Sequence, residues 1–171
     1  MKYISILLLS FTLSFASFDT LNSFDADFTQ SVTDDKEKSL IYEGHILASK
    51  PQNALWNYKT PVKKLVYINR ADVTIVEPEI EQVIIRKIDS SFDFFTLIKN
   101  AKKIEKDVYL ANYKESEFTI TTKNNLIESI SYIDGFENKV KIVFKNQKQN
   151  EKVDKELFTP RFPLEFDIIR D

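Results

Sequence analysis

The sequence predicts a mainly β protein in which one antiparallel sheet curls strongly or closes, and short helices cover its apolar face. Short segments of alternating apolar and polar residues recur along the chain, separated by turns rich in Asn, Asp, Pro and Lys. Only one segment has strong helical periodicity, and no linker or internal repeat interrupts the pattern. A length of 171 residues with 43% hydrophobic content suffices for one domain with a real core.

The N-terminus has the features of a secretory signal peptide. Lys2 supplies a positive start, an apolar run follows over residues 4–15, and small residues at Ser14 and Ala16 suit a signal peptidase. We therefore expect cleavage after Ala16, export to the periplasm, and one mature domain over residues 17–171. The apolar run is short for a bilayer span, and a retained N-terminal anchor is the alternative.

The strands are predicted from alternation with a period of two. From Phe24 to Val32, one face carries mainly apolar residues and the other carries Asp, Thr and Ser. Further strands are expected at 40–48, 55–59, 64–69, 73–76, 80–88, 108–113, 117–122, 127–133, 139–145 and 164–169. The pair Asp134-Gly135 is the strongest hairpin signal, joining residues 127–133 to 139–145.

One helix is expected near residues 92–102, and a shorter one over 18–22. Ser90 or Ser91 can cap the longer helix, and Asp93 would lie in the first turn, where the helix dipole favours an anion. Its apolar stripe contains Phe92, Phe94, Phe95, Leu97, Ile98 and Ala101. This Phe-rich stripe indicates either plain core packing or an apolar lid over a cavity for a lipid-like ligand.

Composition argues against several classes of function. The chain has no cysteine, which excludes disulfides and thiolate metal sites, and only two glycines, which leaves no phosphate-binding loop. Its 24 basic and 26 acidic residues give no basic excess, so general nucleic-acid binding is not expected. With a single histidine a zinc site is not expected either, and we predict no metal and no cofactor.

The sequence offers little material for catalysis. His45 is the single histidine, and no nucleophile or orienting acid is singled out to accompany it, so a structural or surface role is favoured over an exported hydrolase. Asp25 and Asp27 share a strand face, where paired carboxylates can bind calcium or act as acid and base, although such faces are usually just solvated. We predict no catalytic residue and no enzyme activity.

Several motifs together resemble those of the LolA family, periplasmic carriers of outer-membrane lipoproteins. Residues 24–32, Phe-Asp-Ala-Asp-Phe-Thr-Gln-Ser-Val, resemble the family's first-strand signature. The motifs that follow at similar intervals are Gly44, Lys50-Pro51, Trp56-Asn57-Tyr58, Pro61, the run 77–82 with its Pro-x-hydrophobic-x-Gln pattern, and Phe158-Thr159-Pro160. The matches extend over most of the mature chain and are densest between residues 24 and 82.

The resemblance implies a strongly curved, incompletely closed antiparallel β-barrel whose concave apolar face is covered by short helices. It implies a periplasmic carrier that accepts acylated lipoproteins from an inner-membrane ABC transporter and delivers them toward an outer-membrane acceptor. The acyl chains would be shielded in a hydrophobic cavity, and the carrier is expected to act as a monomer. A LolA-like module that senses lipids or lipoproteins without ferrying them is the alternative.

The resemblance also suggests which residues form the cavity and its lid. The expected ligand-binding residues are Phe28, Trp56 and Tyr58 of the sheet, facing or supporting the cavity, and Phe94, Phe95, Leu97 and Ile98 of the lid. Family members commonly have an arginine that holds the lid closed at the position of Lys50. Lysine keeps the charge but lacks the planar fork of donors, so we expect Lys50 to latch the lid through hydrogen bonds to helix or loop carbonyls.

Overall fold

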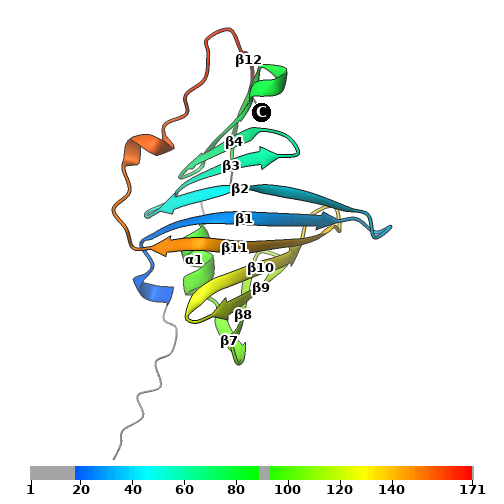
Figure 1. The fold of residues 1–171 in the computed structure, drawn as a ribbon, viewed down its shortest axis with the longest axis vertical. Coiled ribbons are helices and arrows are strands. Elements are labelled where there is room, and N and C mark those ends of the chain that lie inside the picture. Colours follow the sequence, from blue (N-terminus) through cyan, green and yellow to red (C-terminus); the bar gives the residue numbers. More distant parts are fainter. Residues whose placement is uncertain (1–17, 89–92, 171) are drawn as a thin grey trace, which may run out of the picture.

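One strongly curved, unclosed sheet of 12 strands forms the body of the computed structural model, which describes residues 18–88 and 93–170 (Figure 1). The expected signal peptide, residues 1–16, and the expected capping serines Ser90 and Ser91 lie outside the described residues. The strand order is β12-β6-β5-β4-β3-β2-β1-β11-β10-β9-β8-β7. Neighbouring strands are antiparallel except for the parallel pair β12 and β6. The predicted fold class is therefore confirmed.

The strands vary in length from four to 11 residues, whereas each helical segment has at most six residues. The strands are β1 (Ser23–Thr33), β2 (Ser39–Ser49), β3 (Asn53–Thr60), β4 (Lys64–Asn69), β5 (Asp72–Glu77), β6 (Gln82–Lys87), β7 (Lys102–Glu105), β8 (Val108–Tyr113), β9 (Ser116–Lys123), β10 (Leu126–Ile133), β11 (Lys139–Gln149) and β12 (Asp167–Arg170). The helices are the α-helix α1 (Phe94–Lys99) and the 3₁₀ turns η1 (Phe18–Thr20), η2 (Pro78–Ile80) and η3 (Lys155–Phe158). No helix within residues 18–88 and 93–170 has the length and hydrophobicity needed to span a membrane.

Alternation along β1 sets the two faces of the sheet, as predicted. Phe24, Ala26 and Phe28 are buried on the concave face, and Asp25 and Asp27 point to the outer face. The long strands β1, β2 and β11 pair side by side in the centre of the sheet. Because successive residues alternate between faces, this register fixes which side chains of every neighbouring strand reach the concave side.

Gly44 is required by the packing of the concave face. It lies opposite Phe28 in the register of β1 and β2. A Cβ atom at this position would lie 2.7 Å from the Phe28 ring and would also collide with the carbonyl oxygen of Asn57. Glycine therefore leaves the space that the aromatic ring occupies.

The predicted β10–β11 hairpin is confirmed, but its glycine is not what shapes the turn. The Asp134 Oδ1 atom accepts hydrogen bonds from the backbone N–H groups of Phe136 and Asn138, each at 2.9 Å. Glu137, with φ of 64°, takes the left-handed conformation, and neither glycine has a positive φ. The carboxylate thus organises this turn by bonding to the backbone.

The helix predicted over 92–102 is shorter, because a strand takes over its C-terminal part. Asp93 is the N-cap rather than a first-turn residue: its side chain accepts hydrogen bonds from the N–H groups of Phe95 and Thr96. The helix ends at Lys99, and the next segment pairs with β8 as β7, which the sequence did not predict. Tertiary pairing therefore overrides the helical periodicity at Ala101.

Other boundaries also differ from the predictions, and the strand expected over 139–145 continues to Gln149 as β11. The expected helix over 18–22 is only the 3₁₀ turn η1, and the expected strand 164–169 is paired only over 167–170. The expected strand 80–88 begins at Gln82, because Pro78 starts η2 and Glu81 takes a left-handed conformation, with φ of 52°. The turn η3 was not predicted.

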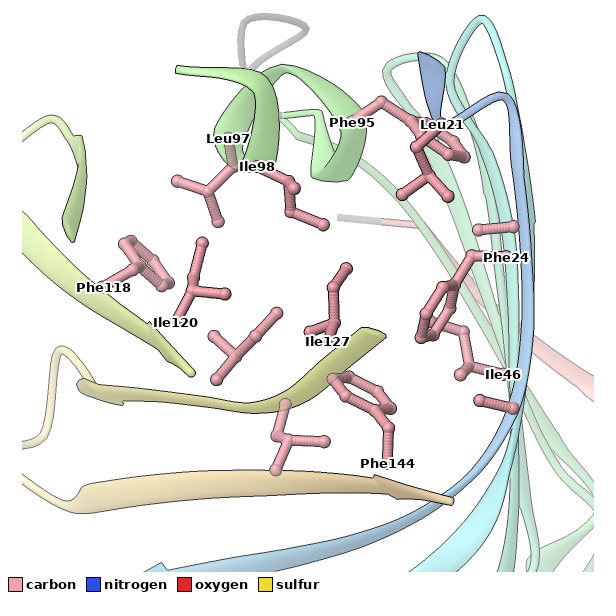
Figure 2. Packing of buried hydrophobic residues seen from close by; sticks show 14 of the residues in the cluster. Leu21, Phe24, Ile46, Phe95, Leu97, Ile98, Phe118, Ile120, Ile127 and Phe144 are labelled. Carbon is pink, nitrogen blue, oxygen red and sulfur yellow. The ribbon is translucent and has the colours of Figure 1, made fainter. Parts of the chain in front are cut away.

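Apolar residues form two clusters, one on each face of the sheet. The larger lies between the concave face and α1, where Leu97 and Ile98 point toward Ile120 and Ile127 (Figure 2). The smaller lies on the outer face of β3–β6, where Phe162 and Phe166 of the C-terminal segment cover it. Its sheet residues are Leu55, Leu65, Tyr67, Val76, Val83 and Ile85. Helix α1 therefore covers the concave face of the sheet.

Candidate functional site

A cavity of about 610 Å³ lies between the concave face and α1. Its volume falls within the range of ligand pockets, roughly 300–1,000 Å³. Most of its walls are apolar or aromatic, with polar groups gathered at a few points. The lining residues are Gln30, Ile46, Gln52, Asn53, Ala54, Trp56, Tyr58, Val66, Ile68, Val73, Arg86, Ile88, Asp93, Phe94, Phe95, Leu97, Tyr113, Lys114, Phe118, Ile130, Tyr132 and Ile142.

Helix α1 supplies the cover of this cavity. Phe94, Phe95 and Leu97, three of the expected lid residues, line it. The Phe94 ring packs against Phe24 of β1, with ring centroids 5.4 Å apart. A helix of six residues is too short to be stable alone, so α1 depends on these contacts with the sheet.

Ile98 has a different position from the other expected lid residues. Its side chain is fully buried and is not part of the cavity lining. Figure 2 shows it pointing from α1 into the apolar cluster below the helix. Ile98 therefore anchors the helix, while Leu97 on the same helix reaches the cavity.

The sheet side of the cavity carries an aromatic cluster. Trp56 and Tyr58 line the cavity. Phe28 is buried behind them, with its ring centroid 5.1 Å from each of theirs in edge-to-face arrangements. Of the three expected sheet residues, two thus face the cavity and Phe28 supports them.

Lys50 lies close to the cover helix. Its Nζ atom is 5.8 Å from the centroid of the Phe95 ring, which is a cation–π contact with α1. Its backbone N–H donates a 2.9 Å hydrogen bond to the carbonyl of Asn22. The contact described between the Lys50 side chain and the helix is therefore with a ring, whereas we expected carbonyl acceptors.

Tyr58 belongs to a group of polar side chains on the concave face, and the sequence prediction did not name its other members, Gln30, Lys64 and Tyr132, as site residues. The Tyr58 hydroxyl donates a 2.9 Å hydrogen bond to Gln30 Oε1, and Lys64 Nζ lies 4.7 Å from the Tyr58 ring centroid. Burial, and then the neighbouring Tyr132 and Tyr42, raise the pKa of Tyr58 well above its usual value. Burial likewise raises the pKa of Tyr132. The place of Gln30 in the alternation of β1 was the signal for its inward orientation.

The single histidine lies on the opposite face. His45 Nδ1 is 2.9 Å from Asp27 Oδ1, and His45 Nε2 is 2.9 Å from Asp25 Oδ1. Asn146 Nδ2 donates a 2.9 Å hydrogen bond to Asp27 Oδ2. The bonds from His45 and Asn146 lower the pKa of Asp27. Both ring nitrogens are engaged by carboxylates, so neither is placed to activate a nucleophile, and the arrangement supports the structural interpretation.

The fold and the cavity define a class of protein: a half-barrel whose helix-covered concave face can enclose an apolar ligand. The family profile described as "Outer membrane lipoprotein carrier protein LolA" matches residues 19–161. The chain belongs to the LolA family.

Relatives with the same printed name support this assignment. An "Outer-membrane lipoprotein carrier protein" of Campylobacter jejuni is 42% identical over 149 residues, covering 87% of each chain. One of Wolinella succinogenes is 31% identical over 159 residues, covering 92% of each. A solved LolA superfamily protein of Nitrosomonas europaea shares the fold, with a TM-score of 0.52 at 8% identity over 85% of this chain and 94% of that one.

Proposed function

We propose that this protein carries outer-membrane lipoproteins through the periplasm with their acyl chains in the cavity under α1. The observation that carries the proposal is the apolar cavity of about 610 Å³, lined by Trp56, Tyr58 and the inner side of the helix. The names of the relatives from Campylobacter jejuni and Wolinella succinogenes support the same role. The chain would receive its cargo from an inner-membrane ABC transporter and give it up to an outer-membrane acceptor.

The energetics of acyl burial favour incomplete enclosure. Burying a chain gains about 0.8 kcal/mol per CH₂, so three chains of about sixteen carbons would exceed the practical affinity ceiling of about 20 kcal/mol. A carrier must release its cargo into a membrane that is equally apolar. Partial burial under a cover of low intrinsic stability therefore suits both loading and release.

Helix α1 is the element of the cavity wall that we expect to move during loading, because it is short and is held to the sheet by side-chain packing. In this proposal Lys50 steadies the covered state through its contact with Phe95, and losing this contact is part of opening.

The proposal is tested by capture of acylated cargo in the periplasm. Native mass spectrometry of the purified protein should find bound acylated peptide or lipoprotein. Leu97→Glu places a charge in the cavity wall and should reduce capture at least about tenfold, because an unpaired buried charge is costly. Ile98→Glu is less suitable, because full burial of Ile98 would couple the change to unfolding.

The matched control is Thr96→Glu, which adds the same charge on the exposed side of α1. This variant should capture cargo normally, and both proteins should give folded circular-dichroism spectra. Equal capture by Leu97→Glu and the wild type would contradict the placement of the ligand. Binding without any transfer to acceptor membranes would favour the sensing module over the carrier.

A further inference from the structure

The cavity has polar side chains at the end far from α1. Gln30 lies six residues beyond Phe24 on β1, which corresponds to about 20 Å of strand at about 3.4 Å per residue. Phe24 packs against Phe94 of the helix, whereas Gln30, Tyr58 and Tyr132 line the cavity beyond it. We refer to Gln30, Tyr58 and Tyr132 as the polar end of the cavity.

Two hydrogen-bond donor groups at the polar end have no partner among the residues that the structure describes. The Gln30 side chain accepts from the Tyr58 hydroxyl through Oε1, which leaves the two hydrogens of its NH₂ group. Within residues 18–88 and 93–170, neither this NH₂ group nor the Tyr132 hydroxyl is hydrogen-bonded to another protein group. Ile130 and Ile142 of the cavity wall lie nearby and offer no acceptor.

Packing holds these donors in place. Tyr132 packs against Phe118 in a tilted arrangement, with ring centroids 4.9 Å apart. Tyr58 is fixed between Phe28 and Tyr42, at 5.1 Å and 5.8 Å from their centroids. Such positioning lowers the entropic cost of forming hydrogen bonds with a ligand.

The unpaired groups select for a ligand that accepts hydrogen bonds. Tyrosine hydroxyls are protonated at neutral pH, so the Tyr132 hydroxyl can donate a hydrogen bond to a ligand. The ammonium group of Lys64, over the Tyr58 ring, adds positive charge at the same end. No buried side-chain nitrogen or oxygen atom of the described residues lacks a hydrogen-bond partner, so these two groups are open to water. A ligand that displaces this water from the mainly apolar cavity is favoured when its own oxygen atoms accept the same hydrogen bonds.

We propose that Gln30 and Tyr132, with Tyr58 orienting Gln30, form a binding site for the ester carbonyl oxygens of diacylglyceryl groups. The inference rests on the proposed function and specifies which part of the lipid lies at this end. With the carbonyls held at Gln30 and Tyr132, the hydrocarbon extends toward α1. The distance suits this arrangement, because one leaflet of a bilayer core, spanned by one acyl chain, is about 15 Å thick.

Intrinsic fluorescence can test the site, because Trp56 is the single tryptophan of the chain and lines the cavity. The full chain is titrated with a dioctanoylglyceryl-cysteine peptide and with its dioctyl ether analogue, which lacks the carbonyl oxygens. The wild type should bind the ester peptide more tightly than the ether. Tyr132→Phe and Gln30→Leu should each weaken ester binding about threefold to tenfold and leave ether binding unchanged.

Tyr42→Phe is the matched control, since it removes a hydroxyl from the same aromatic cluster but not from the cavity lining. It should leave both affinities unchanged. Equal wild-type affinity for ester and ether, or equal loss of both in Tyr132→Phe, would overturn the carbonyl site. Failure of the wild type to bind either peptide would instead refute the proposed function.

A third titration separates the two sources of diacylglyceryl esters. Dioctanoyl-phosphatidylglycerol carries the same esters as the peptide, so Tyr132→Phe should weaken its binding by a similar factor. The ratio of the two wild-type affinities then shows whether lipoprotein or membrane lipid is preferred. A loss confined to the phospholipid would identify the phosphate as the recognised group and would contradict the proposal.

Discussion

The two faces of the sheet differ in how their polar side chains are paired. On the outer face, His45 lies between Asp25 and Asp27, each 2.9 Å away. On the concave face, the Gln30 amide NH₂ and the Tyr132 hydroxyl lack a protein partner among the residues that the structure describes. Paired groups stabilise the fold without a ligand, whereas the groups on the concave face keep donors that a ligand can engage. The difference supports our proposal that the ligand binds on the concave face.

The largest effect should come from the position where the concave face tolerates no side chain. Gly44→Ala adds a Cβ that would meet the Phe28 ring at 2.7 Å, so the aromatic cluster must shift. We expect the free energy of unfolding to fall by about 1–3 kcal/mol, the typical cost of overpacking. Chemical denaturation measures it. Gly135→Ala is the control, because nothing lies within 4 Å of the added Cβ, and a comparable loss there would refute the explanation.

An intermediate effect should appear at alkaline pH and originate on the concave face. Burial raises the pKa of Tyr58 above its usual value of 10.0. A group with a raised folded-state pKa contributes stability below its unfolded pKa, and this contribution is lost as pH rises through the folded pKa. The free energy of unfolding should therefore fall above pH about 10.

Tyr58→Phe should flatten this alkaline dependence in urea titrations at several pH values. Tyr42→Phe, which alters a neighbouring hydroxyl of the same cluster, serves as the comparison. An unchanged slope in Tyr58→Phe would show that Tyr58 does not contribute to the loss of stability.

The smallest effect should come from the outer face. His45 and both carboxylates are partly exposed, and exposed ion pairs contribute little, so His45→Ala should lower the free energy of unfolding by about 1 kcal/mol or less. Capture of acylated cargo should be unchanged, because His45 is outside the cavity lining. Native mass spectrometry of the variant provides the measurement. Loss of capture with an intact fold would break the distinction between the two faces.

The sequence predicted the sheet well because alternation is a local signal. Residues 24–32 carry the period-two pattern that β1 adopts. Asp134, in the predicted Asp-Gly turn, correctly marks the hairpin between β10 and β11. The predicted C-terminal end of the helix was wrong because Lys102 pairs with Leu110 in β8. No local sequence pattern indicates this long-range contact.

The cavity was predicted only in part, for the same physical reason. Trp56 and Leu97 stand out by residue type and lie in its wall. Tyr132 and Arg86 reach it only because the register and curvature of distant strands bring them to the same side. Whether a residue lines the cavity depends on such long-range strand pairing. The sequence of one segment does not determine that pairing.

An unclosed sheet has two edges that a closed barrel lacks, and exposed edges invite pairing with other chains. Both are occupied here by strands of four residues: β7 carries Lys102, Lys103 and Glu105, and β12 begins with Asp167 and ends with Arg170. Short, charged edge strands are poor templates for intermolecular β-pairing. The unclosed form of the sheet, which our proposal uses for ligand uptake, is therefore combined with edges that disfavour aggregation.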